Sequence, residues 1–261
     1  MGKIIKDPLG VRIKENYEFR DRHYLTRRMP VILRLDGKCF SQLTAPLKDR
    51  FDPNFMKVMN LTAIKLCEEI QGAQFAYITS DEISILLHDY KKLTSDAWFD
   101  YNQSKIESIS AAIASVEFTN NSWMIWEALQ SIEGTLPVDK LFYLKPAYFD
   151  SRAFSIPEAE VCNALLWRQQ DSVRNSINSL AQSLYSHKEL QGKSCNEMQE
   201  MCFQKGHNWN DLPTSWRRGR CVVKTTYEVD GTTRGKWVVD DEIPKFSKDR
   251  NYIEKYLATE E

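Results

Sequence analysis

The sequence predicts an α+β fold of the ferredoxin-like, split βαβ type, in which two helices pack on one face of an antiparallel sheet. Three observations support this prediction. The composition, 42% hydrophobic and 27% charged, is that of an ordinary folded chain. Over the first 155 residues, hydrophobic patterns follow the order strand, helix, strand, strand, helix, strand. Only four residues, 79–82, separate the second strand from the third, which is hairpin spacing.

The first four elements follow from residue patterns. The first strand, residues 31–36, places Val or Leu at every second position, as expected when alternate side chains share a face. The first helix, residues 52–72, begins with Asp-Pro, an N-cap followed by a first-turn proline, and repeats apolar residues every three or four positions. The short apolar runs 75–78 and 83–87 form the hairpin.

Two further elements complete the core, and a third helix follows it. The second helix is expected at residues 97–116 and the last strand at 148–154. Residues 119–145 look like an insertion before that strand. The third helix is expected from Glu158 to about Tyr185.

The C-terminal part of the chain is expected to form a region of its own. Residues 221–229 and 232–239 flank Asp230-Gly231 and read as a β-hairpin. We therefore expect a core domain at residues 1–155, including a basic N-terminal segment. We expect a helical and hairpin region, packed on that core, at residues 156–261.

Charge and cysteine usage exclude several classes of protein. The 35 Lys and Arg residues nearly balance the 36 Asp and Glu residues, so a nucleic acid would have to be held by local basic patches. The longest run without a charged residue has 13 residues, fewer than the roughly 18 that a membrane span needs. The six cysteines lack the paired spacing of a zinc site. We expect a cytoplasmic protein with reduced thiols and no membrane contact.

Three acids mark the candidate catalytic centre. Asp36 ends the first strand, and Asp81 and Glu82 lie at the tip of the hairpin. In a split βαβ sheet the first strand lies beside the third, so these acids are expected to converge. Clustered carboxylates favour a divalent cation, and two Mg²⁺ ions can promote phosphoryl transfer. The alternative, that the acids only face solvent at strand ends, stays open at this point.

Other segments carry weaker signals for ligand binding. The loop 36–40 contains Gly37, which allows backbone N–H groups to approach a phosphate closely. Asn102 and Lys105 lie one helical turn apart and could face a triphosphate. Basic residues at Arg217, Arg218 and Arg220 lie near two tryptophans that could stack on bases. Each of these features could equally be solvated surface.

Three motifs in register, residues 34–40, 77–84 and 167–175, give the sequence a family resemblance. It resembles the tRNA-histidine guanylyltransferase family, specifically the bacterial, archaeal and viral guanylyltransferase-like branch. The resemblance implies that the core at residues 1–155 is a palm-like catalytic core of the polymerase type, and it implies addition of nucleotides in the 3′-to-5′ direction to tRNA 5′ ends. It also implies two Mg²⁺ ions, ATP and GTP or other nucleoside triphosphates as substrates, tRNA as a partner, and a homotetramer.

The resemblance also assigns roles to residues. It implies that Asp36 and Asp81, with the Gly37 carbonyl, ligate both metal ions and that Glu82 supports them. The residues that it implies for nucleotide binding are Asp36, Gly37, Lys38, Cys39, Phe40, Ser41, Ser80, Asp81 and Lys105. Further polar positions that match the family, and that are expected to contact nucleotide or tRNA, are Asp150, Arg152, Arg168, Asp171 and Asn175.

One departure bears on specificity. Eukaryotic members carry histidine where this chain has Val173, and valine cannot donate hydrogen bonds. The like-protein branch implies instead templated repair of 5′-truncated tRNA. Two alternatives remain: a palm-type nucleotide cyclase and a non-catalytic tRNA-binding protein. The first is disfavoured because cyclases of the diguanylate kind carry Gly-Gly where this hairpin has Thr79-Ser80. The second is disfavoured because binding alone needs no paired acids.

Overall fold

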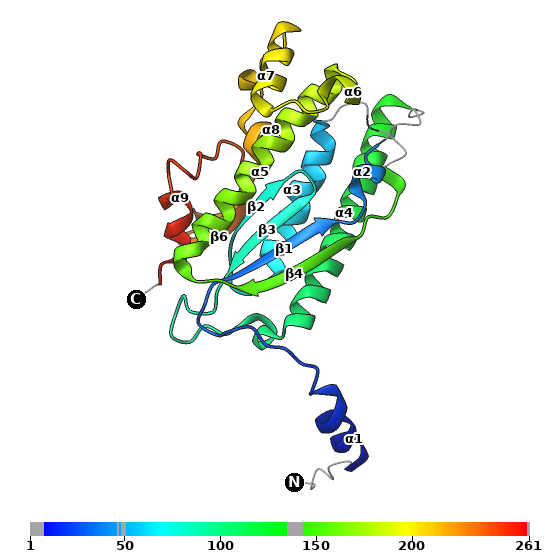
Figure 1. Cartoon of the computed structure of the whole chain (residues 1–261). Coiled ribbons are helices and arrows are strands. Elements are labelled where there is room, and N and C mark those ends of the chain that lie inside the picture. Colours follow the sequence, from blue (N-terminus) through cyan, green and yellow to red (C-terminus); the bar gives the residue numbers. More distant parts are fainter. Residues whose placement is uncertain (1–7, 46, 48–50, 135–142, 260–261) are drawn as a thin grey trace.

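A single antiparallel sheet organises the molecule. The computed structural model describes residues 8–45, 47, 51–134 and 143–259. The strands in these ranges pair in the order β4-β1-β3-β2-β5-β6 (Figure 1). They are β1 Val31–Gly37, β2 Ala73–Thr79, β3 Glu82–Leu87, β4 Phe149–Ser155, β5 Arg220–Val229 and β6 Thr232–Asp240. Because β1 lies between β3 and β4, the predicted split βαβ fold is confirmed.

Two long helices, α3 (Pro53–Glu69) and α4 (Gln103–Glu133), cover one face of this sheet (Figure 1). The side chains of Val31, Leu33 and Leu35 point from β1 into this layer and are fully buried. They share one apolar core with side chains of both helices. This layer is the one that the alternation in residues 31–36 predicts, and its burial supplies much of the driving force for folding.

The opposite face of the sheet is covered by α5 (Glu158–Leu184) and by the C-terminal helix α9 (Asn251–Glu254). Ile32 points from β1 into this second core. Side chains alternate along a strand, so Arg34 and Asp36 also lie on the α5 side of the sheet. The end of β1 therefore presents its acid towards α5.

The other helical segments are short. They are α1 Pro8–Ile13, η1 Lys14–Glu18, α2 Phe40–Leu43, η2 Trp98–Tyr101, α6 His187–Leu190, α7 Cys195–Gln204, η4 Trp209–Asp211, α8 Thr214–Arg218 and η5 Lys255–Leu257. Helix α1 extends away from the sheet, at the opposite end of the molecule from α7 (Figure 1). Within the described ranges, every helix is too short or too polar to cross a bilayer.

The start of the second long helix differs from the prediction of residue 97. Trp98 to Tyr101 instead form a 3-10 turn, within which Phe99 and Asp100 have φ of 50° and 52°. Helix α4 begins only after Asn102, whose side-chain oxygen accepts a hydrogen bond from the Lys105 N–H at 3.2 Å. This N-cap, which satisfies a free backbone donor, sets the start of the helix.

The end of α4 also differs from the prediction, which placed it at Val116. The helix continues to Glu133, so the first half of the predicted insertion, residues 119–145, is an unbroken part of α4. Phe118 and Ile125 hold this part against the sheet, since both are buried in the same core. Residues 135–142 lie outside the described residues.

The predicted C-terminal hairpin is confirmed as β5 and β6. Asp230 and Gly231 link the strands with φ of 51° and 71°, the left-handed conformation that a two-residue turn with a right-handed strand twist requires. Strand β5 also pairs with β2. The C-terminal half of the chain thus extends the sheet built by the first 155 residues.

Candidate active site

The end of β1 and the tip of the β2–β3 hairpin lie side by side. Asp36 faces Glu82 in the register of β1 and β3, and the Gly37 N–H donates to the Asp81 carbonyl at 3.2 Å. These contacts place Asp36 and Asp81 on adjacent chain segments. The convergence of the strand end and the hairpin tip that the topology predicts is therefore confirmed.

The electrostatics of this pair favour a cation. Burial raises the pKa of the Asp81 carboxyl, and the negative charges of Asp36 and Glu82 raise it further. Two carboxylates and a backbone carbonyl at Gly37 are hard oxygen donors of the kind that Mg²⁺ prefers. The donor set therefore fits a magnesium ion, whose positive charge would offset both the burial of the Asp81 carboxylate and its repulsion by Asp36.

The third acid, Glu82, lies beside this pair but is bound by an arginine. Its two carboxylate oxygens accept hydrogen bonds from Nε and Nη2 of Arg168, each at 2.7 Å. Arg168 lies on α5 and also contacts Asp171 at 3.1 Å. Across the described part of the chain, no group of three His, Cys, Asp or Glu residues is arranged to hold a metal. The three acids therefore lie close together, but the charge of the third, Glu82, is neutralised by an arginine 86 residues away.

The ion pair of Glu82 and Arg168 has a structural consequence. It joins the hairpin tip to α5 and so places that helix over the carboxylate end of the sheet. The network continues along α5, where Arg174 contacts Asp171 at 2.6 Å. The family resemblance implies that Arg168 and Asp171 belong to the site. In the structure Arg168 reaches it by binding Glu82, and Asp171 contacts Arg168.

The loop after β1 is shaped by one glycine and one aromatic ring. A Cβ on Gly37 would lie 2.5 Å from the ring of Phe40, so only glycine fits beneath that ring. Phe40 is buried and packs against Phe149 with ring centroids 5.0 Å apart. Its ring is therefore part of the core, and Phe40 also borders the cavity beside the acidic pair. Lys38 and Cys39, by contrast, are exposed.

A cavity of about 630 Å³ lies beside the acidic pair. Its size is in the range of small-molecule sites. It is bounded by the loop after β1, the start of α3, the hairpin tip and α5. Residues that line it include Ser41, Leu47, Asp52, Ser80, Asp81 and Gln182.

A second, smaller cavity of about 100 Å³ adjoins the first, and both are lined by Asp52, Phe55, Ser80 and Ser179. Asn175 of α5 lines this smaller cavity, as does Arg220 at the start of β5. Of these residues, sequence reasoning had missed Asp52 and Ser179 as site residues. Asp52 was recognised only as an N-cap, which it is: its Oδ1 accepts from the N–H groups of Asn54 and Phe55.

The remaining predicted site residues lie in three separate parts of the structure: on β4, at the start of α4, and beside another cavity. Asp150 faces Asp36 across the pairing of β1 and β4, with Arg152 3.6 Å from its carboxylate. Asn102 and Lys105 line neither cavity: the Asn102 side chain caps α4, and Lys105 lies over the Phe99 ring. Arg217 and Arg218 line a separate cavity of about 350 Å³. The predicted basic patch is thus divided between two cavities.

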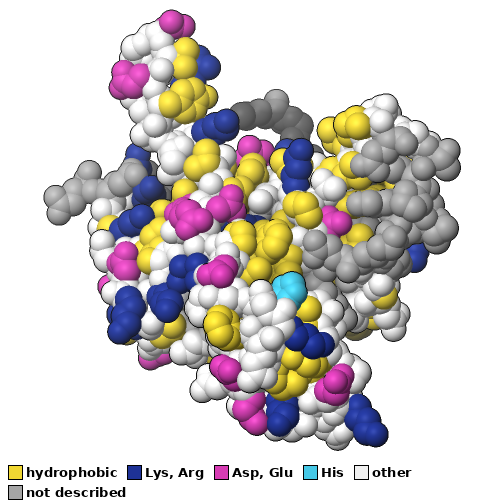
Figure 2. All heavy atoms as spheres, turned by 90° about the horizontal axis from the view of Figure 1, so that it is seen from above, with side chains coloured by type: hydrophobic (Ala, Val, Ile, Leu, Met, Phe, Trp, Pro, Cys, Tyr) yellow, Lys and Arg dark blue, Asp and Glu magenta, His cyan; other side chains and the backbone are white. Residues whose placement is uncertain are grey.

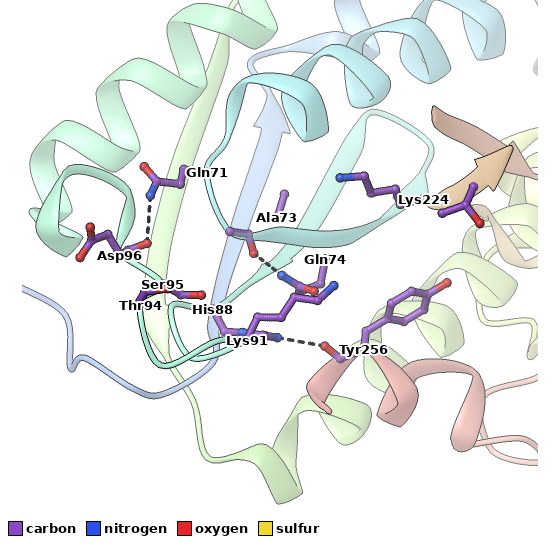
Figure 3. A pocket seen from close by; sticks show the side chains of 12 residues that line it. Gln71, Ala73, Gln74, His88, Lys91, Thr94, Ser95, Asp96, Lys224 and Tyr256 are labelled. Carbon is purple, nitrogen blue, oxygen red and sulfur yellow. Dashed lines mark hydrogen bonds between the residues drawn. The ribbon is translucent and has the colours of Figure 1, made fainter. Parts of the chain in front are cut away.

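A fourth cavity, of about 500 Å³, lies where β2 begins and β5 diverges from it. Lys224 and Lys91 lie on opposite sides of it, and His88 contacts the Tyr256 carbonyl at 3.1 Å (Figure 3). Its one carboxylate, Asp96, is largely exposed. This cavity lacks a paired-acid centre, so we do not assign the chemistry to it. Seen from above, the molecule carries basic and acidic side chains interspersed, in keeping with its near-neutral charge (Figure 2).

Comparisons with known proteins identify the family to which this fold belongs. The model of a family described as tRNAHis guanylyltransferase matches residues 11–157. The chain is 37% identical to a bacterial tRNA(His) guanylyltransferase-like protein solved in complex with ATP. That match has a TM-score of 0.84 and covers 97% of this chain and 100% of the other. A structure described in the same way, in complex with GTP, matches with a TM-score of 0.78 at 37% identity, over 96% and 99% of the two chains.

Sequence similarity to a plant protein indicates the same family. The chain is 29% identical to tRNA(His) guanylyltransferase 2 of Arabidopsis thaliana over 91% of its own length. It spans 44% of the length of that relative.

Proposed function

The chain belongs to the tRNAHis guanylyltransferase family, and on that premise we propose that it adds nucleotides to tRNA 5′ ends in the 3′-to-5′ direction, with Mg²⁺ as cofactor. As a member of this family it is a nucleotidyltransferase. The observation that carries the proposal is the meeting of Asp36 and Asp81 beside a cavity large enough for a nucleotide. A protein that only binds RNA has no need of that pair.

Asp36 and Asp81, with the Gly37 carbonyl, would hold magnesium. When bound there, the ion would stabilise charge on phosphate oxygens and lower the pKa of an attacking hydroxyl. Other residues of the site would contact the substrate directly and not through the metal ion. Exposed Lys38 and the backbone N–H groups that follow it in the loop would bind a triphosphate, since such groups favour anions. The N–H groups of Gly37 and Lys38 already donate to the Asp81 and Tyr148 carbonyls.

Two observations indicate the substrates: the nucleotides bound in structures of relatives, and the valine at position 173 of this chain. Relatives have been solved with ATP and with GTP, and we propose that this chain binds both in the 630 Å³ cavity. Val173 on α5 cannot make the hydrogen bonds of a histidine, so strict recognition of one tRNA is not expected. We propose repair of 5′-truncated tRNA, in which the base opposite selects each added nucleotide. We also propose that the protein is a cytoplasmic tetramer, as the family resemblance implies.

Labelled-nucleotide addition to 5′-truncated tRNA transcripts tests the proposal. Asp36→Asn and Asp81→Asn are expected to lower the rate by roughly a hundredfold or more, because metal ions supply several kcal/mol of transition-state stabilisation. Asp96→Asn, at the opposite end of the sheet, is the matched control and should retain activity. The added nucleotide should change when the opposite base is changed. Binding of tRNA by the wild type without any addition would leave only an RNA-binding role.

A further inference from the structure

Arg220, the first residue of β5, is a buried cation without a matching acid. Its side chain is 2% exposed. Its Nε donates to the Asn60 side-chain oxygen, and its Nη2 donates to the Met56 carbonyl at 3.2 Å. Both acceptors are neutral. Among the described residues, Arg220 makes no ion pair, whereas burial of an isolated charge is costly.

The charge on Arg220 persists at neutral pH. Burial lowers the pKa of its guanidinium to about 10, and the carboxylate that acts on it most is Asp241, which is exposed and forms no ion pair with it. Asp52 lines the same cavity, but its Oδ1 already accepts from two backbone N–H groups and from the Tyr143 hydroxyl. The protein thus keeps a protonated guanidinium beside a cavity without neutralising it.

The cavity next to Arg220 is lined by hydroxyl and amide side chains together with aromatic side chains and Asp52. Asn175, Ser179 and Ser215 face it from α5 and α8, and in the described ranges their side chains have no hydrogen-bond partner. The two bonds of Arg220 use Nε and Nη2, which leaves Nη1 without an acceptor among these residues. Arginine carries five N–H donors and accepts none, so a ligand here must bring acceptors.

We propose that this cavity is a binding site for a single phosphate group, held by Arg220, Asn175 and Ser215. The proposal rests on the proposed function, because it places this phosphate next to the acidic pair: Ser80 borders both cavities and precedes Asp81. A phosphate complements the charge of the Arg220 guanidinium, and its oxygens accept several hydrogen bonds at once. A volume of about 100 Å³ suits one small group rather than a whole nucleotide.

Two substrates carry such a group: a nucleoside triphosphate and a tRNA with a 5′-phosphate. Both present the same chemistry, and binding measurements with matched probes separate them. The probes are ATP with adenosine as its control, and 5′-phosphorylated tRNA with 5′-hydroxyl tRNA as its control. All are titrated without Mg²⁺ or turnover, so that failure of catalysis cannot be mistaken for failure of this site.

Ser215→Asp is the test variant, because it adds a carboxylate that competes with phosphate for Arg220. Ser215→Asn has nearly the same shape without the charge and is its control. We expect Ser215→Asp to weaken ATP, phosphorylated tRNA or both by at least roughly tenfold, the loss that follows removal of a hydrogen bond to a charged group. Adenosine and 5′-hydroxyl tRNA should bind as before. The phosphorylated probe that weakens identifies the source of the phosphate.

Thermal unfolding supplies a second readout for the same two variants. Ser215→Asp should unfold at a higher temperature than Ser215→Asn, since it gives Arg220 an acid partner in the folded state. Arg220→Lys, which keeps the charge but loses the fork of donors, should weaken the same phosphorylated probes as Ser215→Asp. The proposal is overturned if Ser215→Asp binds all four probes like Ser215→Asn, or if the probes without phosphate weaken as much as those with it.

Discussion

Methionine in place of Arg168 would keep most of the side-chain volume on α5 and remove the guanidinium that binds Glu82. In the wild type both hydrogen bonds measure 2.7 Å, and the two side chains are only 14% and 10% exposed. Breaking a buried pair of this kind costs roughly 3–5 kcal/mol, because the remaining charge is left unpaired. Since some exposure remains, we expect about 3 kcal/mol.

For a chain of this size, that loss corresponds to a melting temperature lower by about 6–12 °C. Arg174→Met is the matched control: Arg174 lies on the same helix and contacts Asp171, but its side chain is 57% exposed. An exposed pair is worth about 1 kcal/mol or less. Thermal unfolding at neutral pH compares the two variants, and adding Glu82→Gln to Arg168→Met should restore part of the loss. Equal destabilisation by Arg168→Met and Arg174→Met would refute the reasoning.

Two further predictions concern the acidic pair and its loop. The raised pKa of Asp81 means that the folded protein binds this proton more tightly than the unfolded chain, so stability falls as pH rises from the ordinary carboxyl pKa through the raised value. Asp81→Asn should remove this loss and melt at a higher temperature than the wild type at neutral pH. Melting curves recorded across the acidic range check this, and a pH profile like that of the wild type would contradict it. Gly37→Ala forces a Cβ against the Phe40 ring and should cost about 1–3 kcal/mol in urea unfolding, with lower nucleotide addition. An unchanged urea midpoint would show that the loop can move aside.

The parts of the fold that local patterns encode could be predicted. The alternation in β1 identified the face that packs on α3 and α4, and the four-residue spacing identified the hairpin. Together with the rule that the first strand lies beside the third, they placed Asp36 next to the hairpin tip.

The parts that depend on distant contacts could not be predicted. Glu82 was expected to support the metal ligands, and its bond to Arg168 could not be foreseen because that arginine lies on a helix 86 residues later. Arg220 looked like one more residue of an exposed basic patch, although it is buried and donates hydrogen bonds to Asn60 and Met56 of α3. The start of α4 was misplaced because Phe99 and Asp100 adopt positive φ, which side-chain periodicity does not reveal.

The central claim is that Asp36 and Asp81 together hold the metal. The most direct measurement replaces Mg²⁺ with Mn²⁺ and counts bound ions by electron paramagnetic resonance in the presence of ATP. The wild type and Asp96→Asn should each bind two ions, and the double variant Asp36→Asn/Asp81→Asn should lose both. If the double variant binds Mn²⁺ as the wild type does, the metal lies elsewhere and this account of the site is wrong.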